Sequence, residues 1–253
     1  MNYNWNWGIF FELEPGASGT YLSYLIGGLG WTLITALMAW TLALILGVLV
    51  GMLRTTGNAT VERICFGYTE LFRNIPLLVQ MFLWYFVLPE FLPGTLGTSM
   101  KQMSPPWASM VPAVLCLGIF MSVRVAEQVR SGIQSLPKGQ RMAGQAIGLT
   151  QFQTYRYVLL PMVFRIILPP LTSEFLNTIK NTSLALTIGL MELTARARAM
   201  QEFSFQVFEA FAAATIIYLV VNLLVVLAMR QVERKIRVPG FIGSPGQVPQ
   251  AGH

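Results

Sequence analysis

The sequence predicts an all-α integral membrane protein with about five transmembrane helices, its N-terminus outside and its C-terminus in the cytoplasm. Hydrophobic residues make up 54% of the 253 residues and charged residues only 11%, whereas a soluble domain has roughly a quarter charged residues. A water-soluble fold of this composition would expose large apolar patches. Long uncharged runs alternate with short basic clusters, so the expected surrounding is a lipid bilayer.

The residue types that are missing narrow the possible chemistry. The chain has no Asp, and its only His is His253, which excludes a Ser-His-Asp triad and a His-based metal site. Cys65 and Cys116 lie in apolar runs without metal-ligand spacing and are expected to be core residues. No Gly-Lys dipeptide occurs, which excludes the phosphate-binding loop of ATPases. We therefore expect neither an enzyme nor a cofactor or metal site in this chain.

The apolar runs divide the chain, 1–253, into the helices of one transmembrane domain. A spanning helix needs about 20 mostly apolar residues, and no charge occurs from Leu22 to Leu53. The expected spans are 22–53, 64–88, 106–128, 162–190 and 207–231. The segment before them contains Trp5 and Trp7 but no Lys or Arg, which is typical of an interfacial anchor rather than a signal peptide.

The basic residues predict the orientation, because cytoplasmic loops carry an excess of Lys and Arg. On one side of the expected spans lie Arg54, Arg63, Arg130, Lys138, Arg141, Arg156, Arg230, Arg234, Lys235 and Arg237. On the other side lie only Lys101, Arg196 and Arg198. Because these charges stand at the ends of apolar runs, the net charge of +6 indicates topology and not nucleic-acid binding.

The fourth expected span carries a polar stripe. At about 100° per residue, its polar residues fall within an arc of about 120° on one helix face. They are Ser173, Glu174, Asn177, Lys180 and Asn181. Ionisable groups inside a span are costly and usually face a bundle interior or a water-filled path. We expect the stripe to line a solute path; the alternative is that Glu174 and Lys180 pair with neighbouring helices.

Two further polar groups lie in the second and third expected spans. Pro76 should bend the second span, since proline removes a helical hydrogen bond. Arg73, which precedes it beside Glu70, either meets a substrate carboxylate or belongs to a fixed kink near the cytoplasmic interface. In the third span, Arg124 and Glu127 are interpreted as a capping or gating pair. Five helices are too few to enclose a polar path, so a second copy or a homologous subunit is expected.

The expected cytoplasmic loop, 136–160, combines small residues with a helix-ending glycine. Its distinctive positions, with the proline that follows the loop, are Gly139, Met142, Ala143, Gly144, Ala146, Gly148 and Pro161. A short helix with small side chains can dock closely on a partner, and Gly148 permits a turn that other residues resist. A simple surface turn between two spans is the alternative interpretation.

Taken together, these motifs resemble the permeases of ATP-binding-cassette importers for polar amino acids. The signature of that family is a cytoplasmic Glu-Ala-Ala, a Gly a few residues on, and then an apolar-Leu-Pro. The matching positions are Met142-Ala143-Gly144, Gly148 and Leu159-Leu160-Pro161. The resemblance also covers the segments 73–80, 127–133 and 180–184. Met142 replaces the acidic residue of the signature, and this variant, with the tail from Arg237 to Gly243, resembles the glutamate/aspartate branch.

The resemblance implies a set of partners. The loop helix would dock on an ATPase subunit, and the complete importer would contain two ATP-binding subunits, which hold ATP and Mg, and a second, non-identical permease. A periplasmic binding protein would deliver the amino acid in a bacterial inner membrane. Other cargoes, namely glutamine, arginine or histidine, remain alternatives. A more distant alternative is a secondary transporter driven by an ion gradient, with Glu174 or Glu70 as its ion site.

Overall fold

The computed structural model describes residues 3–14 and 19–236. In this part of the chain every regular element is a helix, apart from a single bridge between Leu13 and Thr20. The main helices are α1 (Tyr21–Leu53), α2 (Ala59–Asn74), α3 (Leu77–Phe82), α4 (Leu88–Phe91), α5 (Gly94–Lys101), α6 (Trp107–Ser135), α7 (Lys138–Ala146), α8 (Gln151–Thr154), α9 (Leu160–Asn181), α10 (Leu193–Ser204) and α11 (Val207–Ile236). The tail from Arg237 to Gly243, which carries part of the resemblance, lies outside the described residues.

Within residues 3–14 and 19–236, four long helical segments are apolar enough to cross a membrane. They are Tyr21–Leu53, Trp107–Ser135, Gln151–Ile188 and Val207–Ile236. A fifth candidate is the pair Ala59–Asn74 and Leu77–Phe91, which is bent by 100° at its break. The all-helical membrane fold predicted from the sequence is therefore confirmed, with four spans or five according to whether the bent pair counts as one.

The bend divides the second expected span, 64–88, at the proline that predicted it. Ile75 is extended, with φ −96° and ψ 128°, because a residue before proline is disfavoured in the helical conformation. The Gln80 side-chain amide donates hydrogen bonds to the carbonyls of Phe72 (2.8 Å) and Ile75 (2.9 Å). Gln80 thus donates hydrogen bonds to carbonyls that lose their helical partners at the break. Backbone groups inside a lipid bilayer need such partners, because no water is present to supply them.

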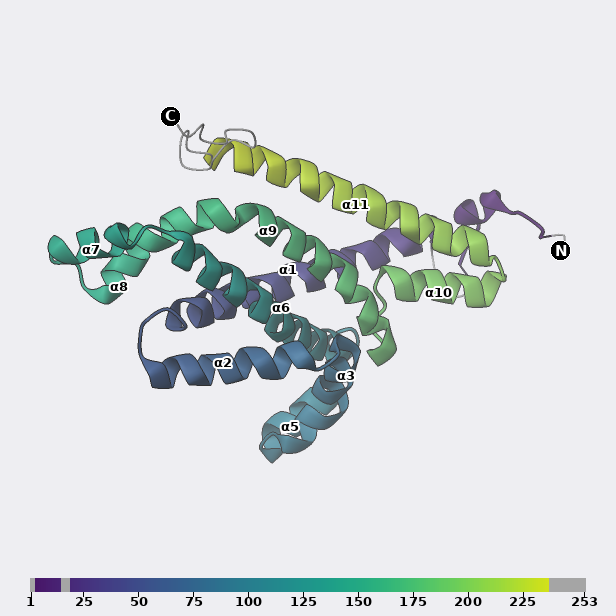
Figure 1. The fold of residues 1–253 in the computed structure, drawn as a ribbon. Helices are drawn as coiled ribbons and strands as arrows, with labels where there is room; N and C mark the ends of the chain where they lie inside the picture. Colours follow the sequence, from purple (N-terminus) through teal and green to yellow (C-terminus); the bar gives the residue numbers. More distant parts are fainter. Residues whose placement is uncertain (1–2, 15–18, 237–253) are drawn as a thin grey trace.

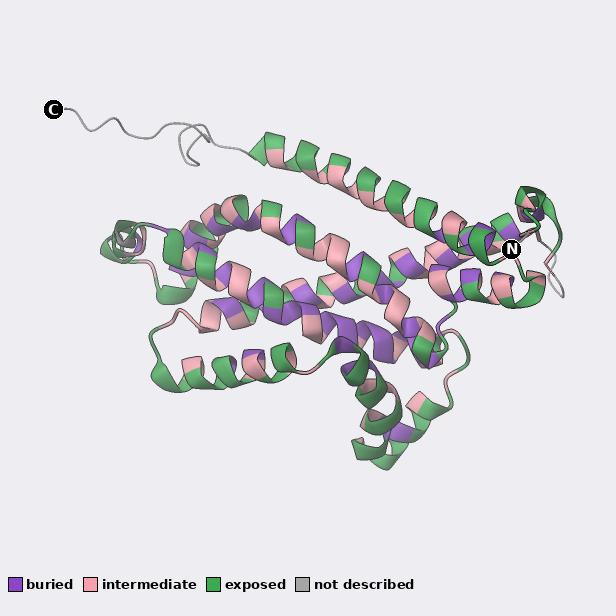
Figure 2. Cartoon of the chain, turned by 45° about the vertical axis from the view of Figure 1, so that its right-hand side comes forward, coloured by how far each residue is buried: buried purple, intermediate pink, exposed green. Residues whose placement is uncertain are grey.

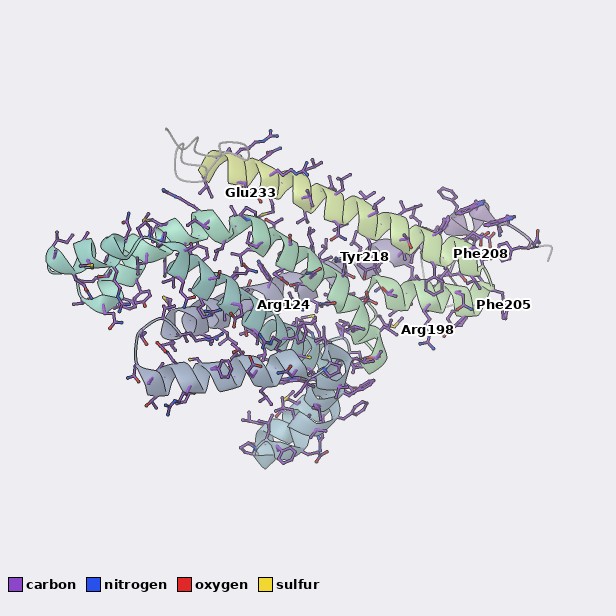
Figure 3. All side chains as sticks on the ribbon, viewed as in Figure 1. Arg124, Arg198, Phe205, Phe208, Tyr218 and Glu233 are labelled. Atoms are coloured by element: carbon purple, nitrogen blue, oxygen red, sulfur yellow. The ribbon has the colours of Figure 1, made fainter. Side chains whose placement is uncertain are left out.

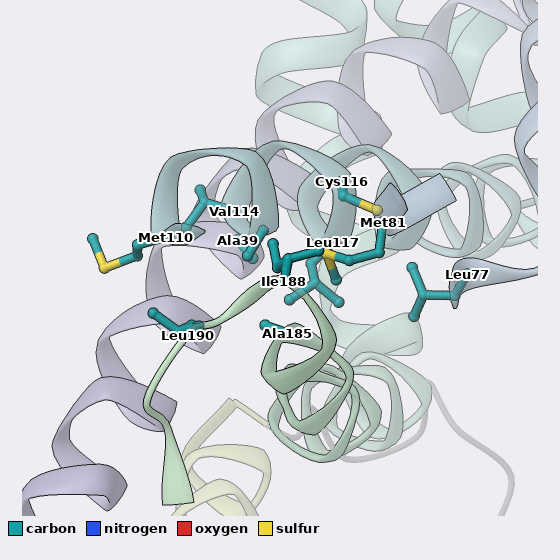
Figure 4. Close-up of a cluster of buried hydrophobic side chains, with 11 residues drawn as sticks. Ala39, Leu77, Met81, Met110, Val114, Cys116, Leu117, Ala185, Ile188 and Leu190 are labelled. Atoms are coloured by element: carbon teal, nitrogen blue, oxygen red, sulfur yellow. The ribbon is translucent and has the colours of Figure 1, made fainter. Parts of the chain in front are cut away.

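Helix α6 forms the centre of the bundle, and α11 lies at its edge (Figures 1 and 2). In the most apolar window of α6, 61% of the residues are buried, against 17% for α11. Helix α1 lies directly against α6, because a Cβ atom on Gly47 would come within 2.5 Å of the Val125 side chain. A cluster that includes Ala39, Leu117 and Ile188 joins α1 and α6 to the turn after α9 (Figure 4).

Buried carboxylates connect the helices at the end of the bundle where the N-terminal segment lies. Glu192, which is fully buried, is the N-cap of α10, where it accepts a 2.7 Å hydrogen bond from the Ala195 amide. It also accepts bonds from the hydroxyls of Tyr218 (2.9 Å) and Thr32 (3.4 Å), and so links α10, α11 and α1. Glu209 on α11 accepts a 2.8 Å bond from the backbone N–H of Asn6.

Candidate functional site

The polar stripe of α9 is the first part of the candidate site. Helix α9 continues without interruption past Pro169 and Pro170. The stripe follows these prolines on the second half of the helix. Ser173 and Lys180 are exposed, whereas Glu174, Asn177 and Asn181 are half-buried. The stripe therefore lies at the boundary between the packed interior and the open surface of the chain.

Glu174 faces α6 across a small cavity. One of its carboxylate oxygens lies 3.8 Å from Nε of Arg124 and accepts a 3.4 Å bond from the Asn177 amide. The cavity, of about 170 Å³, is lined by Arg73, Phe120, Val123, Arg124, Glu127, Gln128 and Glu174. The structure thus brings Arg73 and Glu174 to one place, although they are 101 positions apart in the chain. Arg124, which the sequence suggested as part of a capping or gating pair with Glu127, lines the same cavity; its position on the ribbon is labelled in Figure 3.

The charges around this cavity are paired unequally. Glu127 is held by ion pairs with both Arg54 and Arg130. Arg73 and Arg124 each have one carboxylate within reach, Glu70 at 2.5 Å and Glu174 at 3.8 Å, and both guanidinium side chains are more than half exposed. Exposed ion pairs of this kind contribute about 1 kcal/mol or less to stability. Both guanidinium groups can therefore exchange their partner for another carboxylate at little cost.

Lys180 and Asn181 end the stripe with unused hydrogen-bonding capacity. Among the described residues, no carboxylate lies within ion-pair distance of Lys180. The Asn181 amide approaches the sulfur of Met121 at 4.0 Å, which is a weak acceptor. An ammonium and an amide in this state suit recognition of a polar solute better than structural cross-linking.

The cytoplasmic loop of the prediction forms α7, and its end has the geometry of a Schellman motif. Gly148 has φ +84°, and its N–H donates to the carbonyl of Gln145 at 3.0 Å. The next amide, of Leu149, donates to the carbonyl of Gly144 at 3.1 Å. This pattern defines a helix that ends on a left-handed residue. The structure therefore confirms the turn that was predicted at Gly148.

The small residues of α7 divide into two groups. Gly144 is buried, and a Cβ atom there would lie 3.0 Å from the Thr154 side chain. Its small size therefore serves packing within the chain. The exposed positions are Gly139, Met142, Ala143, Ala146, Ile147 and Gly148. Pro161 is also exposed, in the first turn of α9.

Hydrogen bonds that the sequence did not predict attach this loop to the end of α1. The Tyr155 hydroxyl donates to the carbonyl of Thr55 at 2.8 Å, and an Arg141 guanidinium N–H reaches the same carbonyl at 3.4 Å. The Gln151 amide donates to the carbonyl of Thr56 at 3.3 Å. In the sequence, these contacts are indicated only by polar residues in the segment after α1 and in the loop that contains α7. These bonds fix α7 and α8 to α1, while the chain continues directly from α8 into α9.

The described residues contain no cluster of His, Cys or Glu able to hold a metal ion. Both cysteines are free and buried.

The comparisons with known proteins decide the family. Residues 43–238 match the family described as binding-protein-dependent transport system inner membrane component. The chain belongs to this family. It is 44% identical to the glutamate/aspartate import permease protein GltJ of Escherichia coli K12, over 96% of this chain and 99% of that protein. The glutamine transport system permease protein GlnP of the same organism is 31% identical, over 85% of this chain and 93% of its own length.

Solved structures agree with this membership. A chain in the crystal structure of an amino acid ABC transporter with histidines has a TM-score of 0.71 and 30% identity, over 85% of this chain and 95% of that one. A chain of the MetNI methionine transporter, with a TM-score of 0.64 and 19% identity, shares the fold over 86% of this chain and 96% of its own. As a member of the family, the chain is a multi-pass permease subunit of the inner membrane.

Proposed function

We propose that this permease imports the acidic amino acids glutamate and aspartate. The observation that carries the proposal is the 44% identity to the glutamate/aspartate permease GltJ, which extends over nearly the whole of both chains. The chemistry of the cavity supports the same cargo. Arg73 and Arg124 line one cavity, and Lys180 lies on the same helix as the cavity residue Glu174. Guanidinium groups pair with carboxylates in a bidentate geometry.

The solute path in this proposal follows the α9 stripe at the junction with a second permease subunit. Its proposed lining residues are Arg73, Ser173, Glu174, Asn177, Lys180 and Asn181. A single chain with four or five spans leaves the stripe at its surface, so a second, non-identical permease would close the path. We propose an outside N-terminus and a cytoplasmic C-terminus, on the strength of the asymmetry in Lys and Arg.

Energy would enter through α7. The chain has no phosphate-binding loop of its own, so two partner subunits would bind ATP and Mg and hydrolyse the nucleotide. The exposed side of α7, with Met142 and Ala143, would dock on such a subunit. Its movement would reach α1 through Thr55 and α9 through the direct chain connection. A periplasmic binding protein would deliver the amino acid to the opposite face.

Another polar amino acid is the second candidate cargo, because the glutamine permease GlnP is also 31% identical to this chain. The cargo is tested with the purified importer complex in liposomes that contain its binding protein. We expect glutamate and aspartate to stimulate ATP hydrolysis, whereas glutamine, arginine and histidine leave it at the basal rate. Stimulation by one of the latter, with no response to glutamate or aspartate, would refute the proposed cargo. An uptake that survives ATP depletion but stops with an uncoupler would indicate an ion-driven transporter instead.

A further inference from the structure

A second cavity, which shares no lining residue with the cavity at Glu174, lies between the first half of α9 and the end of α11. Its volume is about 270 Å³. Its polar lining consists of Arg165 from α9 and Arg230, Glu233 and Arg234 from α11. Glu233 is labelled in Figure 3, where the last turns of α11 run beside α9. A 3.2 Å hydrogen bond from the Thr172 hydroxyl to Glu233 joins the two helices here.

The cavity has an excess of positive charge without internal partners. Arg230 and Arg234 are four residues apart on α11 and therefore share one face of the helix. Among the described residues, no carboxylate lies within 4.0 Å of the three lining guanidinium groups. The sequence that follows Ile236 contains no Asp or Glu side chain either. All three arginines are exposed, and Glu233 is the one carboxylate that lines the cavity, so their guanidinium groups are free to bind an external anion.

The surroundings of the cavity indicate which anion. Its apolar walls include Leu168 and Ile236. Helix α11 lies at the edge of the bundle and has the smallest buried share of the four unbroken candidate spans. Its outer face exposes Leu223 and Leu227. An apolar, lipid-exposed helix face therefore leads directly to a group of arginines at the end of the span. A phospholipid matches this arrangement, because its apolar acyl chains end at a negatively charged phosphate.

We propose that this cavity binds the phosphate of an anionic phospholipid, whose acyl chains lie along α11. Basic pockets between the ends of transmembrane helices recognise anionic headgroups in this way. The planar guanidinium fork matches two phosphate oxygens at once. The bound lipid would hold α11 against α9 close to the loop that carries α7. The inference does not depend on which amino acid the permease carries.

The test measures phosphatidylglycerol bound to the purified importer complex in nanodiscs of phosphatidylcholine. We expect the Arg230→Gln/Arg234→Gln double variant to bind it roughly thirtyfold more weakly, since each direct guanidinium–phosphate hydrogen bond contributes about 1 kcal/mol. The control is Lys235→Gln, which removes a charge from the same helical turn but does not line the cavity. Its affinity should stay within about twofold of the wild type, because the Lys235 ammonium makes no direct contact with a phosphate in the cavity.

Two further measurements separate lipid binding from a failure of assembly and from binding of free phosphate. Arg165→Gln removes the contribution of α9 alone and should weaken binding by about fivefold, even if the double variant does not assemble. Millimolar inorganic phosphate should not displace the lipid, because phosphate lacks the acyl chains. Equal affinity in wild type and Arg165→Gln, an equal loss in Lys235→Gln, or displacement by inorganic phosphate would each overturn the proposal.

Discussion

Glu174 and Glu192 are both carboxylates in an apolar chain, yet the structure uses them in opposite ways. Glu192 is fully buried, caps α10 and accepts bonds from α1 and α11. Glu174 is half-buried, with a 3.8 Å contact to Arg124 and a 3.4 Å bond from Asn177. The carboxylate of Glu192 is saturated with partners inside the fold, whereas that of Glu174 has only long contacts and, in our proposal, meets the solute. The number and length of hydrogen bonds therefore distinguish structure from function better than charge does.

The largest expected effect concerns Glu192. Glu192→Ala removes a helix cap and two side-chain partners, which should lower the free energy of unfolding by about 3 kcal/mol. Burial raises the pKa of the Glu192 carboxyl. Glu192→Gln keeps the side-chain length and an oxygen that can accept from the Ala195 amide, so it should cost less than Glu192→Ala. Thermal unfolding of the detergent-solubilised protein measures both. Equal melting temperatures for Glu192→Ala and the wild type would contradict the stabilising role of Glu192.

Helix α7 likewise has residues that shape the fold and residues that face outward. The next largest expected effect is the loss of transport when the Gly148 turn at its end is strained. Gly148→Val places a branched residue at φ +84°, at a cost of about 1–2 kcal/mol, and should abolish transport while the spans remain inserted. Gly148→Asn is the matched control, because Asn tolerates this conformation. Co-purification of the ATPase measures docking. If Gly148→Val retains normal transport and ATPase association, α7 is not the coupling helix.

A neighbouring pair of residues in α7 sharpens this test. Ala143 is exposed and Gly144 is buried against Thr154. We expect Ala143→Glu to abolish ATPase association without changing the melting temperature. Gly144→Val should lower that temperature by several degrees, because the added side chain enters the packed contact with α8. A stable fold in Gly144→Val, or unfolding caused by Ala143→Glu, would reverse the assignment of the two positions.

Lys180 should show an intermediate effect that is confined to transport. Lys180→Gln removes a charge without a partner among the described residues, so glutamate uptake should fall roughly tenfold, the value of one charge-assisted hydrogen bond. Assembly should remain normal. Lys180→Arg, which retains the charge, should restore most of the uptake. Loss of the Lys180→Gln protein from the membrane would instead support the alternative in which Lys180 holds helices together.

The smallest expected effect on stability is that of Arg124. Its contact with Glu174 is long and more than half exposed on the arginine side, so Arg124→Gln should change the free energy of unfolding by less than about 1 kcal/mol. The KM for glutamate should nevertheless rise several-fold, because the guanidinium group is then absent from the cavity. An unchanged KM would exclude Arg124 from solute recognition.

The sequence predicted the features that depend on local chemistry. Pro76 marked the break after α2, Gly148 marked the end of α7, and periodicity placed Asn177 and Asn181 on one face of α9. It did not predict features that depend on packing between distant helices. Thr32 meets Glu192 across 160 positions, and no local pattern connects them. The contact between Gly144 and Thr154 was not predicted for the same reason.

In the proposed importer the α9 stripe faces the path of the solute, whereas the Glu192 network does not. Single cysteines at Asn181 and Thr32, in a chain whose Cys65 and Cys116 are replaced by Ser, test it in the assembled importer. An aqueous thiol reagent should label Asn181→Cys, glutamate with the binding protein and ATP should slow this labelling at least tenfold, and Thr32→Cys should remain unlabelled. An unreactive Asn181→Cys, or labelling that glutamate does not slow, would contradict the claim.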